Sequence, residues 1–215
     1  QRFNQQWTLS HGTSSVMKSL MMKGEAPETV DLPHDAMIAM SRSADAPSGP
    51  GMAYFHGKEL EYARTFFVSR EERERVHYLN FDGIYMNASI LINGVFAAKH
   101  RCGYTPCTLR IDEFLNYGEE NEGQVAIRGS ALPNARWYPG EGIYREVWML
   151  EGEQLHIAPD GLRVTVTDCD RELAVLEIET EVRNAGAQPR KAWAEISILD
   201  GEGPEAARRT ARFNV

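Results

Sequence analysis

The chain has 215 residues, of which 42% are hydrophobic, and its formal net charge at pH 7 is -8. That hydrophobic content is enough to bury a core in one large domain or in two smaller ones. The acidic excess argues against a nucleic-acid partner, because phosphate binding needs clustered lysine and arginine, which here are interleaved with aspartate and glutamate. We therefore expect a soluble globular protein.

Membrane and targeting signals are weak in this sequence. No apolar run approaches the roughly 20 residues that a bilayer-spanning helix needs, and residues 1–10 lack the apolar centre of a signal peptide. The cysteines are Cys102, Cys107 and Cys169, an odd and sparse set that is typical of a reducing compartment. We predict a cytoplasmic protein with no membrane partner, and a local disulfide between Cys102 and Cys107 is the less favoured alternative.

From residue 62 onward the chain shows short apolar runs separated by turn residues. The segment 30–35 predicts an extended stretch before Pro33 and a turn that Asp35 closes by accepting backbone N–H groups. Asn93-Gly94 supplies the two positive-φ positions of a two-residue hairpin. Strands are expected from residue 7 and over 63–68, 76–81, 88–92, 95–98, 107–111 and 124–128, with loops over 10–28 and 41–51 and a helical turn over 69–75. This spacing predicts a β-sandwich or jelly roll.

The pattern changes after residue 150. Residues 152–161 are predicted to form a linker. Beyond it, apolar and polar residues alternate as in antiparallel strands with one solvated face, over 162–167, 174–182, 191–199 and 208–215. Four strands fall short of the roughly seven that an immunoglobulin-like sandwich needs. We therefore expect a second domain that is cut short here, in a longer parent protein.

Candidate catalytic and metal-binding groups are few. His100, Cys102 and Cys107 are three potential zinc ligands close in sequence, but zinc sites use paired spacing and no second pair follows. The acidic runs 71–74 and 119–122 predict solvated turns rather than an acid–base pair. Nucleophile-elbow, zinc-protease and phosphate-loop motifs do not occur in the sequence. We expect no metal, no cofactor and no catalytic residue in this chain.

The segment 137–148 is unusually aromatic, with two tryptophans and two tyrosines around two glycines and a proline. Proline and glycine disfavour a helix, so the segment predicts a tight turn followed by a strand. On that strand, Tyr144, Glu146, Trp148 and Leu150 would share one face. Exposed aromatic rings on a β scaffold suit sugars, whose C–H faces pack on them. The alternative is a buried core or domain-interface cluster.

Five segments occur in the order found in glycoside hydrolase family 2, the family of β-galactosidases, β-glucuronidases and β-mannosidases, and resemble its amino-terminal part. They are Asp31-Leu32-Pro33-His34-Asp35, Tyr62-Ala63-Arg64-Thr65-Phe66, Phe81-Asp82-Gly83-Ile84 through Ile92-Asn93-Gly94, Gly103-Tyr104-Thr105-Pro106, and Arg136-Trp137-Tyr138-Pro139-Gly140 through Gly142-Ile143-Tyr144-Arg145. The resemblance implies an all-β chain, with a jelly-roll sugar-binding domain over 1–152 and a truncated immunoglobulin-like β-sandwich over 153–215. A catalytic TIM barrel with two glutamates of a retaining mechanism would follow, and its roughly 250 residues do not fit after residue 150.

The resemblance thus implies the non-catalytic amino-terminal region of a β-galactosidase-like enzyme that hydrolyses O-glycosyl bonds. Its partners would be the carbohydrate substrate and the catalytic barrel of the same chain. The resemblance is also compatible with a homo-oligomer. The first domain would pack on the barrel and lend a loop to the rim of the active site. Two alternatives stay open, namely a free-standing carbohydrate-binding module and a scaffold without sugar contact.

The resemblance also points to residues at that rim. In several relatives an aspartate that contacts the sugar lies six residues before the glycine of the Gly-Ile-aromatic-Arg run, and here that position is Arg136. A guanidinium group could instead pair with a barrel carboxylate or with an acidic substrate. We predict that Asn134, Arg136 and Trp137 contact substrate, and the alternative is that they only line an interface.

Overall fold

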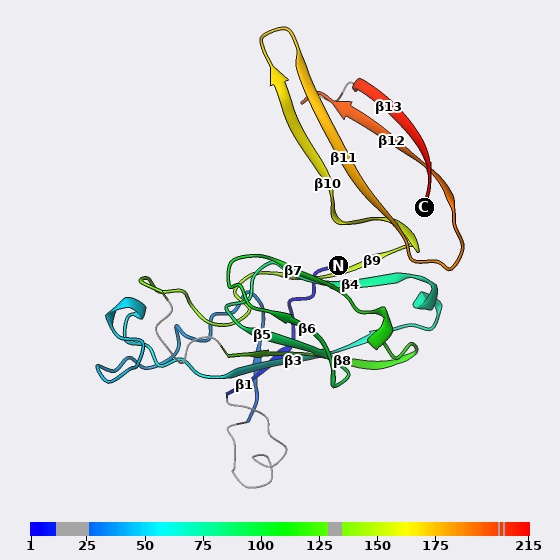
Figure 1. Cartoon of the computed structure of the whole chain (residues 1–215). Helices are drawn as coiled ribbons and strands as arrows, with labels where there is room; N and C mark the ends of the chain where they lie inside the picture. The colour runs from blue at the N-terminus through cyan, green and yellow to red at the C-terminus, as the bar shows by residue number, and fades with distance from the viewer. Residues whose placement is uncertain (12–25, 129–134, 202, 204) are drawn as a thin grey trace. The chain divides into compact units, whose positions relative to one another are not determined.

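The computed structural model describes residues 1–11, 26–128, 135–201, 203 and 205–215, and almost all of its regular structure is β-strand, as predicted (Figure 1). The chain divides into two compact units, Gln1–Glu151 and Gly152–Val215. Within the described ranges, no helix has the length and apolar character needed to cross a membrane.

The first unit contains a six-stranded sheet with the order β2-β1-β3-β8-β5-β6. Every described pairing in it is antiparallel. Tyr62 of β3 and Ile90 of β5 both pair with Val125 of the intervening strand, so buried residues of three strands line up across the sheet. The strands are β1 (Trp7–His11), β2 (Glu28–Val30), β3 (Leu60–Val68), β5 (Ala88–Ile92), β6 (Val95–His100) and β8 (Glu119–Ile127).

A three-stranded sheet with the order β7-β4-β9 forms the second layer of this unit. Its strands are β4 (Val76–Phe81), β7 (Cys107–Arg110) and β9 (Val147–Gly152), and the short 3-10 helices are η1 (Pro50–Met52), η2 (Glu71–Glu74) and η3 (Asp112–Phe114). One hydrophobic core unites both sheets, with Leu60, Tyr62, Ile90, Val125 and Ile127 from the first and Leu79, Phe81, Leu109, Val147 and Met149 from the second. Two sheets around one core confirm the predicted β-sandwich.

The predicted hairpin at Asn93-Gly94 is confirmed. Asn93 and Gly94 have φ angles of 52° and 75° and connect β5 to β6. The Asn93 side chain also accepts the backbone N–H of Glu122 at 2.9 Å and donates to the Oδ1 of Asn121 at 2.7 Å. The turn is thereby attached to β8 as well as to its own hairpin.

Two predictions for the first unit were wrong. The acidic run 119–122 is not a turn but the beginning of β8, because Asn121 between the glutamates is buried and the run pairs with residues 65–68 of β3. The strand expected from Tyr144 begins only at Val147. From Val147 the expected alternation holds, with Val147 and Met149 buried and Trp148 only partly buried.

The second unit consists of two antiparallel hairpins, β10 (Leu155–Cys169) with β11 (Ala174–Asn184) and β12 (Lys191–Leu199) with β13 (Glu205–Asn214). Side chains of both hairpins line a shared cavity of about 350 Å³, among them Leu176, Ile178, Ile196 and Ile198. The predicted linker 152–161 was wrong, because Leu155 already begins β10. A register shift between residues 157 and 162 accommodates the intervening proline and glycine within that strand.

Candidate functional site

The aromatic loop, which we define as residues 135–146, precedes β9 and contains most of the segment that the sequence singled out. Gly142, at φ 135°, exchanges backbone hydrogen bonds with Tyr85, at 2.9 and 3.1 Å. A Cβ at Gly142 would lie 2.5 Å from the Tyr62 hydroxyl and 2.8 Å from the His34 carbonyl oxygen. Only glycine fits there, which explains why the loop can lie so close to the segment 33–36.

Asp35 is the principal anchor of the aromatic loop. Its Oδ1 accepts the backbone N–H groups of Met37 and Glu141, both at 3.0 Å, and its Oδ2 accepts the hydroxyl of Tyr138 at 2.6 Å. The predicted local turn role of Asp35 is confirmed by the bond to Met37. Burial, together with this hydrogen bond and the negative charge of Asp35, raises the pKa of Tyr138. The loop is therefore held by one carboxylate about a hundred residues away in sequence.

Behind the loop, a small polar network is buried in the sandwich. Glu141 is fully buried, and its Oε2 lies 3.4 Å from the backbone nitrogen of Lys58, which donates to it. The Tyr62 hydroxyl is near the backbone of Ile143 and lies 2.8 Å from Nδ1 of His34. Burial raises the pKa of Tyr62, so its hydroxyl stays protonated. Asp35 and Glu141 thus hold the aromatic loop in place.

His34 gives this network a pH dependence. Burial lowers its pKa below the ordinary 6.5, although Glu28 and Asp35 act in the opposite direction. The unfolded chain then binds more protons than the folded chain at mildly acidic pH. We expect the free energy of unfolding to fall as the pH drops below about 6.5, until the lowered pKa of folded His34 is passed.

Two measurements check this expectation. An NMR titration of the His34 ring should give a midpoint below 6.5 in the folded protein. Urea denaturation at several pH values should show a smaller loss of stability in His34→Gln than in the wild type. A folded-state midpoint at or above 6.5 would contradict the assignment.

The exposed part of the site is an aromatic pair, Tyr104 and Trp137. Both side chains are more than half exposed, at 54% and 58%, and the indole N–H of Trp137 donates to the hydroxyl of Tyr104 at 3.0 Å. The Tyr104 segment is attached to the loop again where the Tyr144 hydroxyl donates to the carbonyl of Gly103 at 2.7 Å. Two of the segments that carry the family resemblance therefore meet at one surface.

The structure describes two of the three residues that were predicted to contact substrate. Asn134 lies outside the described residues. Arg136 and Trp137 are both exposed at the start of the aromatic loop, and the Cα of Arg136 lies 3.7 Å from the position that a Cβ on Gly51 would take. Sequence reasoning missed Tyr104 as a neighbour of Trp137. The only signal for it was an aromatic residue within the Gly-Tyr-Thr-Pro segment.

Other candidate groups in this unit take different positions. A cavity of about 390 Å³ is lined by His11, His34, His56, Glu28 and Lys58 among others, and neither Arg136 nor Trp137 is among its lining residues. Cys102 and Cys107 are free thiols, so the alternative of a disulfide between them is not formed. Nε2 of His100 lies 3.0 Å from the carbonyl oxygen of Thr105.

The geometry of the aromatic pair suits binding rather than bond-breaking chemistry. Exposed indole and phenol rings offer flat apolar faces to the C–H face of a pyranose, and nearby polar groups can bind its hydroxyls. The backbone of the aromatic loop, which carries Trp137, is held by Asp35 and by the close approach at Gly142. A rigid aromatic surface loses little conformational entropy when a ligand binds.

The chain resembles known proteins in both sequence and structure. No family model matches the chain. The chain is 34% identical over 178 residues to the β-galactosidase BoGH2A of Bacteroides ovatus, covering 83% of this chain and 21% of that protein. It is 28% identical over 137 residues to a β-glucuronidase of Bacteroides fragilis, covering 60% of this chain and 18% of that protein.

Among solved structures, a glycosyl hydrolase family 2 member from Bacteroides cellulosilyticus superimposes with a TM-score of 0.89 and 27% sequence identity. The match covers 100% of this chain and 28% of that structure's chain. The curated relatives and the solved structures all point to glycoside hydrolase family 2. This chain corresponds to a small part of each of those proteins.

Proposed function

We propose that this chain is the non-catalytic amino-terminal region of a family 2 glycoside hydrolase, a retaining β-glycosidase of β-galactosidase type. In this proposal residues 1–152 are the jelly-roll sugar-binding domain and residues 153–215 are the truncated immunoglobulin-like domain. The first domain packs on a catalytic barrel and contributes the aromatic loop to the rim of the active site. The chain by itself is then catalytically inactive.

One observation carries the rim assignment, namely the exposed pair formed by Trp137 on the anchored aromatic loop and Tyr104 on the segment attached to that loop. Large exposed aromatic surface on a rigid backbone is typical of a binding surface. Arg136, exposed beside the pair, supplies a planar cation for a carboxylate of the barrel or of the substrate. The galactosidase assignment is supported by the 34% identity to the β-galactosidase of Bacteroides ovatus.

The test of the enzyme assignment uses the full-length protein encoded by the gene that contains this sequence. We expect it to hydrolyse a chromogenic β-galactoside faster than the matching β-glucuronide and β-mannoside. Preference for the glucuronide would refute the galactosidase assignment alone. A full-length protein that cleaves none of the three glycosides would refute the enzyme assignment.

Replacing Trp137 tests the rim role within the active enzyme. We expect Trp137→Ala to raise KM by about fivefold, equivalent to about 1 kcal/mol of lost stacking, with kcat less affected. Because Trp137 is largely exposed, stability should change little. Trp193→Ala is the matched control, since Trp193 is an exposed tryptophan of the second unit at 73%. Equal kinetics for both variants would argue for a scaffold without sugar contact.

The second candidate function is a free-standing carbohydrate-binding module, and the same exposed aromatic pair favours it. It requires that the chain alone binds sugar. Calorimetric titration of the 215-residue chain with galactosides, glucuronides and mannosides separates the two candidates. Saturable heat that disappears in Trp137→Ala would support the module, and no heat with any of the sugars would reject it.

A further inference from the structure

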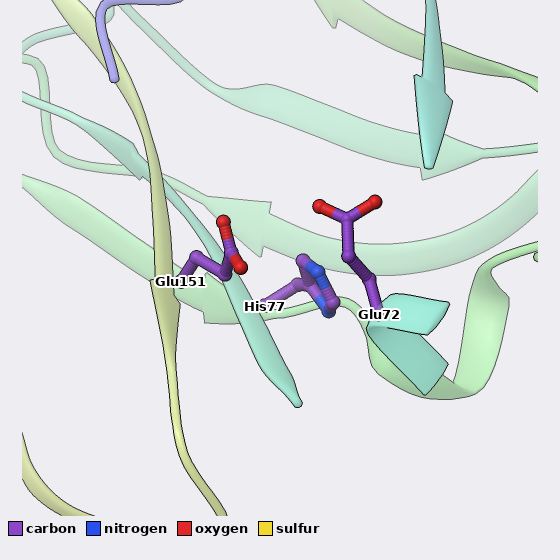
Figure 2. A group of neighbouring side chains, drawn as sticks. All are labelled: Glu72, His77 and Glu151. Atoms are coloured by element: carbon purple, nitrogen blue, oxygen red, sulfur yellow. The ribbon is translucent and has the colours of Figure 1, made fainter. Parts of the chain in front are cut away.

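Three potential metal ligands meet at the three-stranded sheet, two of them only five residues apart and the third far along the chain. Glu72 lies on η2, His77 on β4 and Glu151 on β9, the neighbour of β4 in that sheet. One ligand atom of each lies within 4.8 Å of the other two. Figure 2 shows the His77 ring between the two carboxylates.

The buried histidine is the observation that singles out this cluster from ordinary surface acids. The side chain of His77 is only 2% exposed, and neither of its ring nitrogens has a hydrogen-bond partner within the described ranges. A buried polar nitrogen without a partner costs free energy. A cation bound to one ring nitrogen of His77 would remove this free-energy cost. The carboxylates of Glu72 and Glu151 would supply further ligands for the same cation.

A third carboxylate, that of Asp112, lies beside the ring of His77. Nδ1 of His77 lies 3.7 Å from Oδ1 of Asp112, which also accepts the backbone N–H of His77, and Asp112 is further held by Arg110. Histidines that bind metals usually present their second ring N–H to a carboxylate, which fixes the tautomer and raises the basicity of the ligand nitrogen. With Nδ1 facing Asp112, Nε2 is left to bind an ion.

Each of the two glutamates uses one oxygen within the protein and has a second one for an ion. Oε2 of Glu72 accepts the backbone N–H of Ser69 at 2.6 Å, and Oε1 of Glu151 pairs with Arg75. In a tetrahedral zinc site the ligand atoms are about 3.4 Å apart, given metal–ligand distances near 2.1 Å. The ligand atoms here lie within 4.8 Å of one another, and a rotamer change of the exposed Glu151 side chain can shorten its distances to the other two ligands.

We propose that Glu72, His77 and Glu151 bind a zinc ion, with Asp112 orienting His77 and water completing the coordination. One imidazole with two carboxylates suits zinc, whereas calcium and magnesium prefer oxygen ligands alone. The site is structural, because the ion ties the end of β9 to β4 and η2. The sequence predicted no metal because the ligands that it singled out, His100, Cys102 and Cys107, have no second pair, and nothing in it links Glu151 to His77.

Calorimetric titration of the chelator-treated chain with zinc chloride tests the proposal. A background of Cys102→Ser and Cys169→Ser removes two exposed thiols that could bind zinc elsewhere. We expect saturable binding of one ion per chain, at least about tenfold weaker in Glu72→Gln and in Glu151→Gln. Asp112→Asn should weaken it by about ten- to a hundredfold through the orientation of His77.

Glu71→Gln is the matched control, because Glu71 is an exposed glutamate of the same 3-10 helix and is not in the cluster. It should bind zinc as the background protein does. Circular dichroism and urea denaturation of each variant without metal separate loss of a ligand from loss of the fold. No saturable binding up to about 1 mM zinc, or unchanged binding in both glutamine variants of the cluster, would overturn the proposal.

Discussion

Replacing Asp35 with alanine is expected to lower the free energy of unfolding of the first unit by about 3 kcal/mol. The carboxylate accepts two backbone N–H groups and the Tyr138 hydroxyl, and two of these donors belong to the aromatic loop. A buried or half-buried donor that loses its acceptor costs about 1–3 kcal/mol, whereas the exposed Tyr138 hydroxyl can turn to water. The loss should therefore come mainly from the two backbone groups.

Urea denaturation measured by tryptophan fluorescence checks this, in a Trp193→Phe background that restricts the signal to the first unit. Asp31→Ala is the matched control, since Asp31 is an aspartate of the same segment that accepts one exposed backbone N–H, from Gln6 at 2.9 Å. It should cost less than about 1 kcal/mol. Equal losses for the two variants would show that Asp35 does not hold the aromatic loop.

Gly142→Ala is expected to destabilise the first unit by about 3 kcal/mol. Gly142 has a φ of 135°, which L residues rarely adopt, and its added Cβ would meet the Tyr62 hydroxyl at 2.5 Å and the His34 carbonyl oxygen at 2.8 Å. The tyrosine hydroxyl is buried and the carbonyl belongs to the backbone, so neither can move away at low cost. The aromatic loop would have to shift away from the segment 33–36.

The same denaturation experiment measures the loss. Gly94→Ala is the control, because Gly94 also has a positive φ, 75°, but an added Cβ would meet nothing within 4 Å. It should cost about 1 kcal/mol from backbone strain alone. If Gly142→Ala cost no more than Gly94→Ala, the close approach of the loop to Tyr62 and His34 would not matter for stability.

The strands were predictable because each is a local pattern. Residues 76–81 and 88–92 alternate or concentrate apolar side chains between turn residues, and the structure gives the same bounds. Where local signals compete, the prediction was wrong. Glutamates at 119–122 suggested a turn, but pairing with β3 and burial of Asn121 make that run a strand. Pro159 and Gly161 suggested a linker, but the register shift within β10 accommodates them.

The candidate site was predictable only in part. The aromatic density and the family resemblance identified Trp137 and Arg136, which the structure places at an exposed position of the loop. Asp35 was expected to accept backbone N–H groups within its own turn, and it does so at Met37. Its bonds to Tyr138 and Glu141 span more than a hundred residues of sequence, and no local pattern indicates them.

The sequence by itself determined the all-β class, the hairpin at Asn93-Gly94 and the similarity to family 2, because these depend on residues a few positions apart. Tertiary structure alone decided that Tyr104 meets Trp137, and that Glu72 and Glu151 meet at His77. The physical reason is strand order. The sheet β7-β4-β9 brings together strands from distant parts of the chain, and which side chains become neighbours follows from that pairing and not from their spacing in the sequence.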